Sequence, residues 1–311
     1  MENTVCRKIN QKTHIRRFLA SWRLYVCVLP AVVYLFLFNY MPMYGIIIGF
    51  KNYNPALGIS RSAWVGFEHF YTFITSIQFA QLVRNTFLIS FYSLIFGFPI
   101  PIILALMLHE AKSLAFKKFV QNATYIPHFI STVVMVSMVI IFTSPEIGII
   151  NTFIKWFGGS PVDFMGKAEY FRTVYIVSGI WQSMGWNSII YFAALAGVDP
   201  QLYEAAEIDG ASRLQRIRHI NLPSIAPTIV MLFIMSCGSL LSVGYEKIFL
   251  MQNSLNIEVS EVISTYVYKV GLIGAKFSYT TAIGLFNTLI NFTMLLIVNF
   301  ISRSISDNGL F

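Results

Sequence analysis

The chain has 311 residues, of which 56% are hydrophobic, 16% aromatic and 12% charged, and its mean hydropathy is +0.65. The charged share is about half that of a typical soluble domain, so the composition excludes an ordinary soluble protein and indicates a polytopic membrane protein. The net charge of +8 fits basic loops that face anionic lipid better than it fits nucleic acid binding. Cys6, Cys27 and Cys237 form no CxxC motif, so we expect free thiols rather than a disulfide framework or a thiolate metal site.

Long apolar runs recur along the chain. A helix that crosses a hydrocarbon core needs about 20 apolar residues, and six runs reach this length: Leu24 to Phe50, Asn85 to Leu108, Val120 to Phe142, Thr173 to Ala196, Ile225 to Gly244 and Thr280 to Ser302. We therefore predict an all-α fold with one six-span transmembrane domain over residues 24–302. The first run is too long for the apolar core of a signal peptide and is expected to remain as an anchor. Pro30 and Pro42 allow it to bend or to end early.

The distribution of Lys and Arg predicts the orientation of these spans. With the N-terminus inside, the segments 1–23, 109–119, 197–224 and 303–311 hold 13 basic residues in 71 positions, against 9 in the 99 positions of the outer segments. Basic residues favour the cytoplasmic side. We therefore expect a basic cytoplasmic segment over 1–23, a cytoplasmic loop over 197–224 and a cytoplasmic tail over 303–311 in a protein of the cell membrane.

The loop between the fourth and fifth spans contains the most polar stretch of the chain, YEAAEIDGASRLQRIRHINLP, from Tyr203 to Pro223. Asp199 can cap a helix whose first turn holds Pro200. This helix is expected to stop at Gly210, because a residue without Cβ tolerates the left-handed turn. The sequence therefore predicts a short helix that ends in a sharp bend.

A second helix is predicted directly after the bend. Ser212 with Gln215 three residues later forms a capping box, and Pro223 leads into the fifth span. The two helices together make a helix-turn-helix elbow under the membrane. Ala205 and Ala206 leave little bulk on the first helix, which suits insertion into a groove of another protein. A solvated amphipathic loop helix is an equally good interpretation of these residues alone.

The loop resembles the EAA loop found in the permease subunits of ABC importers. Four elements at fixed spacing carry the resemblance: Glu204-Ala205-Ala206, Gly210 after three residues, Ile220 after nine more, and Leu222-Pro223 after one more. The segments YMPMYGIIIGFKNYNP, WVGFEHF and FSYTTAIGLFNTLINF are similar to the carbohydrate permeases of this family, especially those for oligo- and polysaccharides. The resemblance covers nearly the whole chain and implies the type I ABC importer permease fold with six transmembrane helices.

The resemblance also implies the partners. The chain would pair with a second homologous permease, two ATPase subunits and an extracellular solute-binding protein, and import a carbohydrate across the lipid membrane. The first loop helix would be a coupling helix that docks on the ATPase through Tyr203, Glu204, Ala205, Ala206, Asp209, Gly210 and Ala211. No cofactor is expected in this chain, because the partner ATPase would bind ATP and Mg²⁺.

Missing motifs agree with a transport subunit that is not itself an enzyme. The sequence contains no GxxxxGK[ST], HExxH or GxSxG, so the chain offers no phosphate loop of its own. A membrane-embedded enzyme is not favoured, because the predicted spans contain no catalytic constellation. A self-contained secondary transporter would need internal repeats and usually intramembrane carboxylates, and the predicted spans contain no Asp or Glu. An importer for another solute, such as peptides or amino acids, stays open as the alternative.

Polar side chains inside the spans predict a substrate path. Such groups are costly in lipid and usually face the bundle interior, another subunit or a water-filled path. They occur at similar predicted depth in three spans: His128, Ser131 and Thr132 in the third, Gln182, Ser183, Trp186 and Asn187 in the fourth, and Ser236 and Ser239 in the fifth.

This set offers hydroxyls, amides and aromatic faces, including Trp181, which suit an uncharged saccharide site. The alternative for each residue is structural, because Ser and Thr can bond back to their own helix and Asn, Gln or His can join helices. Asn287 and Asn291 in the sixth span are expected to face the partner permease instead.

Overall fold

The computed structural model describes residues 22–305 and is helical apart from one two-stranded hairpin. The described part of the chain forms two compact units, which divide after Glu68. Cys27 and Cys237 are free thiols, as predicted. Cys6, the predicted basic segment up to residue 21 and the end of the tail lie outside the described residues.

The first unit consists of one long helical segment and a small hairpin. The helical segment runs from α2 (Trp22–Leu35) through the π-helical η1 (Phe36–Tyr40) and α3 (Met41–Met43) to the 3₁₀-helical η2 (Tyr44–Phe50). It is long and apolar enough to cross a membrane, as expected for the first predicted span. Strand β1 (Lys51–Asn52) then pairs antiparallel with β2 (Ala63–Trp64), and α4 (Gly58–Arg61) lies between them.

Three further helices of membrane length lie in the second unit. They are Phe79–Glu110, which comprises α6 (Phe79–Gly97) and α7 (Pro99–Glu110), Arg213–Gly238, and α18 (Phe277–Ile305) up to Arg303. With the first unit, residues 22–305 thus hold four such helices, or five if one bent pair is counted. Helix α11 (Ala168–Ala196) covers the predicted fourth span; its 29 residues extend about 43 Å at 1.5 Å per residue, although it is less apolar than the others.

The predicted third span is not one continuous helix. It divides into α8 (Leu114–Tyr125) with η3 (Ile126–Phe129), and α9 (Thr132–Thr143), and the two parts are bent by 107°. Pro127 lies in η3, and Ser131 adopts an extended backbone and caps α9 by accepting from Val134 N at 3.4 Å. Proline and a new N-cap both interrupt a helix, so the apolar run concealed a break.

The predicted fifth span ends earlier than expected. Helix α14 (Leu222–Gly238) stops before residues 239–244, which form a turn that leads to α15 (Tyr245–Met251). Asn291 Oδ1 accepts from Leu241 N at 2.8 Å and Asn291 Nδ2 donates to Ser242 Oγ at 2.8 Å. Asn287 Nδ2 donates to Leu241 O at 3.3 Å.

The prediction that Asn291 faces the partner permease is therefore wrong, because its side chain is buried against its own chain. For the half-buried Asn287 it stays a prediction. Both side chains bind the turn of their own chain, because non-helical backbone at membrane depth needs hydrogen-bond partners from protein.

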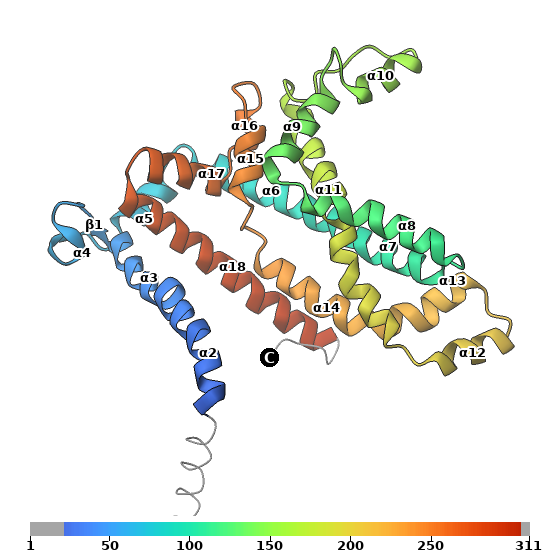
Figure 1. Cartoon of the computed structure of the whole chain (residues 1–311). Coiled ribbons are helices and arrows are strands. Elements are labelled where there is room, and N and C mark those ends of the chain that lie inside the picture. The colour runs from blue at the N-terminus through green and yellow to red at the C-terminus, as the bar shows by residue number, and fades with distance from the viewer. Residues whose placement is uncertain (1–21, 306–311) are drawn as a thin grey trace, which may run out of the picture. The chain divides into compact units, whose positions relative to one another are not determined.

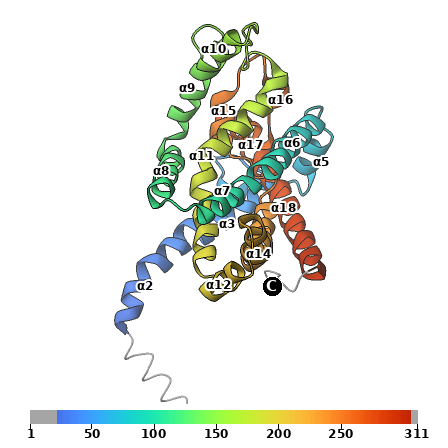
Figure 2. The ribbon, with the colours of Figure 1, turned by 90° about the vertical axis from the view of Figure 1, so that its right-hand side faces the viewer.

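The remaining helices of the second unit are short: α5 (Glu68–Ile74), α10 (Ile149–Trp156), α16 (Ile257–Ser260), α17 (Ile263–Val267) and η5 (Tyr268–Ile273). Helix α11 lies at the centre of this unit and packs against α6, α7, α8 and α14. One buried cluster joins α7, α11 and α14 around Ala105, Leu195 and Ile225. In both views α10 lies at one end of α11 and α12 (Pro200–Ile208) lies at the other (Figures 1 and 2).

Candidate functional site: a cavity beside α11 and a loop at the end of the bundle

A cavity of about 830 Å³ lies within the second unit, beside α11. Its walls come from α6, the start of α7, α11, the end of α14, the turn that follows it and the start of α15. The polar side chains in the lining are mostly hydroxyls and amides: Ser90, Ser93, Tyr175, Gln182, Ser183, Asn187, Tyr191, Ser236, Ser239, Ser242 and Lys247. Among the described residues that line it there is no Asp or Glu, and Lys247 is the one charged side chain.

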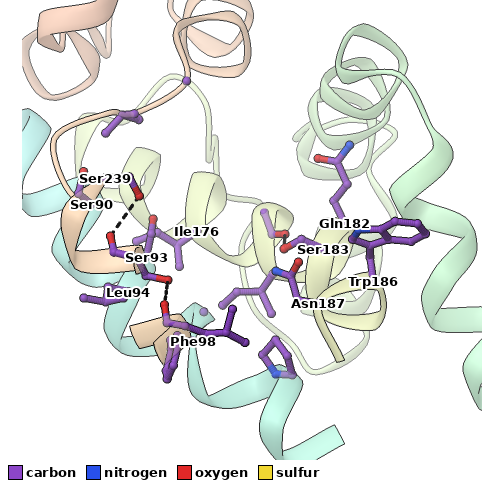
Figure 3. A pocket seen from close by; sticks show the side chains of 18 of the residues that line it. Ser90, Ser93, Leu94, Phe98, Ile176, Gln182, Ser183, Trp186, Asn187 and Ser239 are labelled. Atoms are coloured by element: carbon purple, nitrogen blue, oxygen red, sulfur yellow. Dashed lines mark hydrogen bonds between the residues drawn. The ribbon is translucent and has the colours of Figure 1, made fainter. Parts of the chain in front are cut away.

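Six of the nine predicted path residues line this cavity: Gln182, Ser183, Trp186, Asn187, Ser236 and Ser239. The four on α11 are brought together because residues four apart share one face of a helix. Figure 3 shows Gln182 and Trp186 toward the α8–α9 segment, with Ser90, Ser93 and Ser239 on the opposite side. Whether these residues contact substrate stays a prediction.

The other three predicted path residues lie at the bend of the third span and do not line the cavity. The prediction that they lie at the same membrane depth as the other six assumed a continuous third span. The 107° bend shows that this span is broken. His128 nevertheless contacts the site, because its ring stacks on Trp186 with the centroids 4.4 Å apart. Ser131 caps α9, and Thr132 is its first residue.

Several predicted residues use their donors within the protein. The hydroxyls of Ser183 and Ser236 donate to Gly179 O and Leu232 O, each at 2.8 Å, and Gln182 Nε2 donates to Ile130 O at 3.2 Å. Each hydroxyl keeps its acceptor lone pairs. Gln182 therefore ties α11 to the bend of the third span, which is the structural alternative given for it above.

Gly185 allows α11 and α8 to approach closely beside the cavity. A Cβ at this position would overlap the backbone of Thr124. The indole of Trp186, one residue further along, is 44% exposed. The close approach therefore positions a large aromatic face at the edge of the cavity.

Sequence reasoning missed Lys247, Ser90 and Ser93. A fifth span that extends to Gly244 places Lys247 in an outer loop instead of the cavity. The signal that could have placed it is the Gly238-Ser239 pair, where α14 ends and the chain turns back beside α11. Ser90 and Ser93 lie on α6, and their spacing of three residues puts them on one face.

The polar loop has the structure that its sequence predicts. Asp199 caps α12 by accepting from Gln201 N at 2.9 Å, and Pro200 occupies the first turn. Gly210 has a φ of +70°. Gly210 N donates to Glu207 O at 3.1 Å and Ala211 N donates to Ala206 O at 2.8 Å, which is the bond pattern of a Schellman motif.

The second loop helix also begins as predicted. Ser212 and Gln215 form the reciprocal capping box of α13 (Arg213–Arg216). The π-helical η4 (Ile217–Asn221) then continues into α14. The local caps therefore fix the angle of the elbow.

A polar network attaches the elbow to the end of α7. Arg216 forms an ion pair with Glu110 at 2.8 Å. Asn221 Nδ2 donates to the other oxygen of Glu110 at 3.0 Å, and Tyr203 Oη donates to Asn221 Oδ1 at 2.6 Å. Burial, and secondly the Glu110 carboxylate, raise the pKa of Tyr203, which keeps this phenol a donor.

The elbow presents an apolar surface away from this network. Ile208 is 87% exposed and Leu214 is 75% exposed, and Glu204, Ala205 and Asp209 are also exposed. Large exposed apolar residues rimmed by charges are typical of a protein interaction site. Three of the predicted coupling residues are half-buried and do not belong to this exposed surface: Tyr203, Ala206 and Ala211.

Comparison with known proteins gives concordant similarities. A family model described as "Binding-protein-dependent transport system inner membrane component" matches residues 97–307. The chain is 41% identical over 311 residues to the polygalacturonan/rhamnogalacturonan transport system permease protein YteP of Bacillus subtilis (strain 168), which covers 100% of this chain and 97% of YteP. It is 40% identical over 288 residues to protein LplB of the same organism, which covers 93% of this chain and 91% of LplB.

Two solved structures are similar over almost the whole chain. One is a bacterial ABC transporter involved in the import of the acidic polysaccharide alginate, with a TM-score of 0.85, 41% identity and coverage of 94% of this chain and 98% of that chain. The other is the bacterial alginate transporter in complex with its alginate pentasaccharide-bound periplasmic protein, with a TM-score of 0.86, 41% identity and coverage of 95% and 99%. The helical fold described above is therefore also that of an importer permease.

Proposed function

Because the chain belongs to the family of binding-protein-dependent transport system inner membrane components, the permeases of ABC importers, we propose that it forms half of the translocation path for an oligo- or polysaccharide. As a family member it is a multi-pass inner-membrane transport subunit and not itself an enzyme. The substrate class is suggested by the names of its similar proteins, which include a pectin-type permease and an alginate importer.

The observation that carries the substrate class is the chemistry of the cavity. Its lining combines hydroxyl and amide groups with the exposed indole of Trp186. Sugars present many hydroxyls, which exchange hydrogen bonds with such groups, and apolar C–H faces, which stack on aromatic rings. The absence of Asp and Glu from the described residues of the lining argues against a site for cationic solutes.

The elbow is the proposed contact with the ATPase. Its exposed Glu204, Ala205 and Ile208 would enter the partner, while the Schellman turn at Gly210 and the network around Glu110 would pass a push on α12 to α7 and α14. The helix bundle would have two conformations, inward-facing and outward-facing, and the ATPase would shift the equilibrium between them.

The proposed partners follow from this arrangement. A second permease would complete the path, two ATPase subunits would bind ATP and Mg²⁺, and a binding protein would deliver the saccharide from outside. The location of α10 and α12 at opposite ends of α11 (Figure 2) supports opposite membrane sides for them. With the basic loops inside, both termini would be cytoplasmic.

The test is ATP-dependent uptake by the importer purified with its partner subunits and reconstituted in liposomes. We expect labelled oligosaccharides delivered by the binding protein to accumulate only when the ATPases can use ATP. Uptake of a peptide or an amino acid with no saccharide uptake would contradict the substrate class. Saccharide uptake without ATP would contradict the proposed coupling.

A further inference from the structure

Lys247 is a cation whose position the predicted path did not include. It lies near the start of α15, just after the turn that ends the fifth span, and its side chain lines the cavity together with Gln182, Ser183 and Asn187. Its ammonium group donates to Tyr175 O at 2.8 Å and lies 4.4 Å from the centroid of the Tyr175 ring. Both contacts come from α11 and fix the ammonium group against this wall.

The ammonium group has no counter-ion within the part of the chain that the structure describes. Neither of the ion pairs Arg216–Glu110 and Lys269–Glu261 includes Lys247. An ammonium group has three donors, and Tyr175 O takes one. Two donors are therefore left at the wall of a cavity whose described lining has no carboxylate of its own.

A partly buried cation without an anion is costly, since the lost hydration is not repaid. Burial lowers the pKa of Lys247 to about 7, which expresses this cost. An anion that enters the cavity would restore the balance and would gain charge-assisted hydrogen bonds. The hydroxyl and amide groups elsewhere in the lining suit an anion that also carries hydroxyl groups.

We propose that Lys247 recognises the carboxylate of a uronic acid residue in the transported saccharide, and that it selects acidic over neutral chains within the path. The inference rests on the proposed function and adds the charge of the substrate to it. Hydroxyl and amide groups would bind the sugar ring while Lys247 holds its carboxylate. The similar proteins named for polygalacturonan and alginate are consistent with this charge.

The test uses the reconstituted importer with its binding protein at saturation. Two substrates of equal length are compared, a uronic acid trisaccharide and the same trisaccharide with its carboxyl groups methyl-esterified. Lys247→Gln keeps a donor for Tyr175 O but has no charge, and Lys247→Arg keeps the charge. Comparing each variant with wild type cancels the preference of the binding protein, which is common to all.

We expect Lys247→Gln to raise the KM for the acidic trisaccharide about tenfold, the effect of losing one charge-assisted hydrogen bond, and to leave the esterified form within about twofold. Lys247→Arg should retain the acidic preference, and the yield of assembled complex should stay near wild type for both variants. An equal loss of transport for the acidic and the esterified trisaccharide would overturn the inference and assign Lys247 a structural role. The same conclusion would follow if Lys247→Gln failed to assemble while Lys247→Arg transported both trisaccharides normally.

A KM of Lys247→Gln that equals that of wild type for both trisaccharides would overturn the inference and leave saccharide import standing. No uptake of either trisaccharide or of any other oligosaccharide would instead contradict the proposed function itself. The two failures are therefore distinguishable in one experiment.

Discussion

The imidazole of His128 lies parallel to the indole of Trp186, with 4.4 Å between the ring centroids and 4° between the planes. The two rings come from different helical segments, the 3₁₀ turn η3 at the bend of the third span and the middle of α11. One face of the indole is thus covered by protein, and the bend of the third span helps to hold the aromatic wall of the cavity.

We expect His128→Ala to reduce saccharide uptake several-fold, because Trp186 would lose a ring contact of about 0.5–1.5 kcal/mol that fixes its orientation. His128→Phe keeps a flat ring and serves as the control. Uptake and complex yield are measured on the same reconstituted samples. A fall in yield alone, with normal uptake per complex, would assign the pair to packing only.

Gly210 provides the test of the elbow. Its φ of +70° costs a residue with Cβ about 1–2 kcal/mol. No atom lies within 4 Å of the position that a Cβ would occupy, so Gly210→Val strains the backbone with no clash from neighbouring elements. Uptake and stimulated ATPase activity should fall sharply while the protein still inserts. Gly197→Ala is the matched control, since Gly197 has a right-handed φ of −88°. Normal transport by Gly210→Val would disprove coupling through this turn.

Glu110 provides the test of the network under the elbow. Glu110→Ala leaves Arg216 and Asn221 without their acceptor, and unsatisfied donors at a partly buried site cost about 1–3 kcal/mol. We expect a clear fall in the melting temperature of the purified complex. Arg218→Ala, at an exposed position of the same segment, should change the stability by less than about 0.5 kcal/mol. Equal melting temperatures for the two variants would show that the network does not stabilise the elbow.

The orientation has a direct chemical test. In a variant whose native cysteines are replaced, Ser212→Cys should react with an impermeant thiol reagent only from the cytoplasmic side, and Ser160→Cys only from outside. The expectation rests on the density of Lys and Arg in the loops. Reversed labelling would remove the elbow from the side on which ATP is available.

Lys247 predicts a pH dependence of transport. Its pKa of about 7 in the empty cavity means that the ammonium form is lost as the pH rises above 7, so the KM for an acidic saccharide should increase between about pH 7 and 9. Tyr175 and Tyr191, the other titratable groups of the lining, carry no charge in this range. Lys247→Arg should abolish the dependence. An identical pH profile in both proteins would exclude Lys247 as its source.

A rise in pH affects stability in the opposite direction: the same titration of Lys247 that weakens transport is expected to stabilise the folded chain. A lysine ordinarily titrates near pH 10.4, so between about pH 7 and 10 the unfolded chain binds more protons at this residue than the folded chain does. The contribution of Lys247 to the free energy of unfolding therefore increases with pH over this range. Thermal unfolding of the substrate-free complex measures it.

The elbow could be predicted in detail from the sequence because its determinants are local. Asp199, Gly210 and the Ser212–Gln215 box each satisfy backbone groups within a few residues, so spacing alone specifies the geometry. The membrane-length segments could be predicted as apolar runs, because the length of such a run can be counted in the sequence. Neither the caps nor the apolar runs depend on knowing which other helices pack against them.

The breaks in the third and fifth spans could not be predicted from hydropathy. The run from Val120 to Phe142 stays apolar through its 107° bend, and the carbonyl of Ile130 at the bend is satisfied by Gln182 from another helix. Asn291 does the same for the turn after α14. Such bonds join residues about 50 positions apart, and Lys247 was missed because one of these breaks redirects the chain toward the cavity.

The bonds from Asn287 and Asn291 to the turn after α14 have a mechanical consequence. The wall of the cavity formed by residues 239–244 is anchored to α18 through Leu241 and Ser242. We therefore expect this wall to move together with α18, so that a displacement of the last helix changes the width of the cavity.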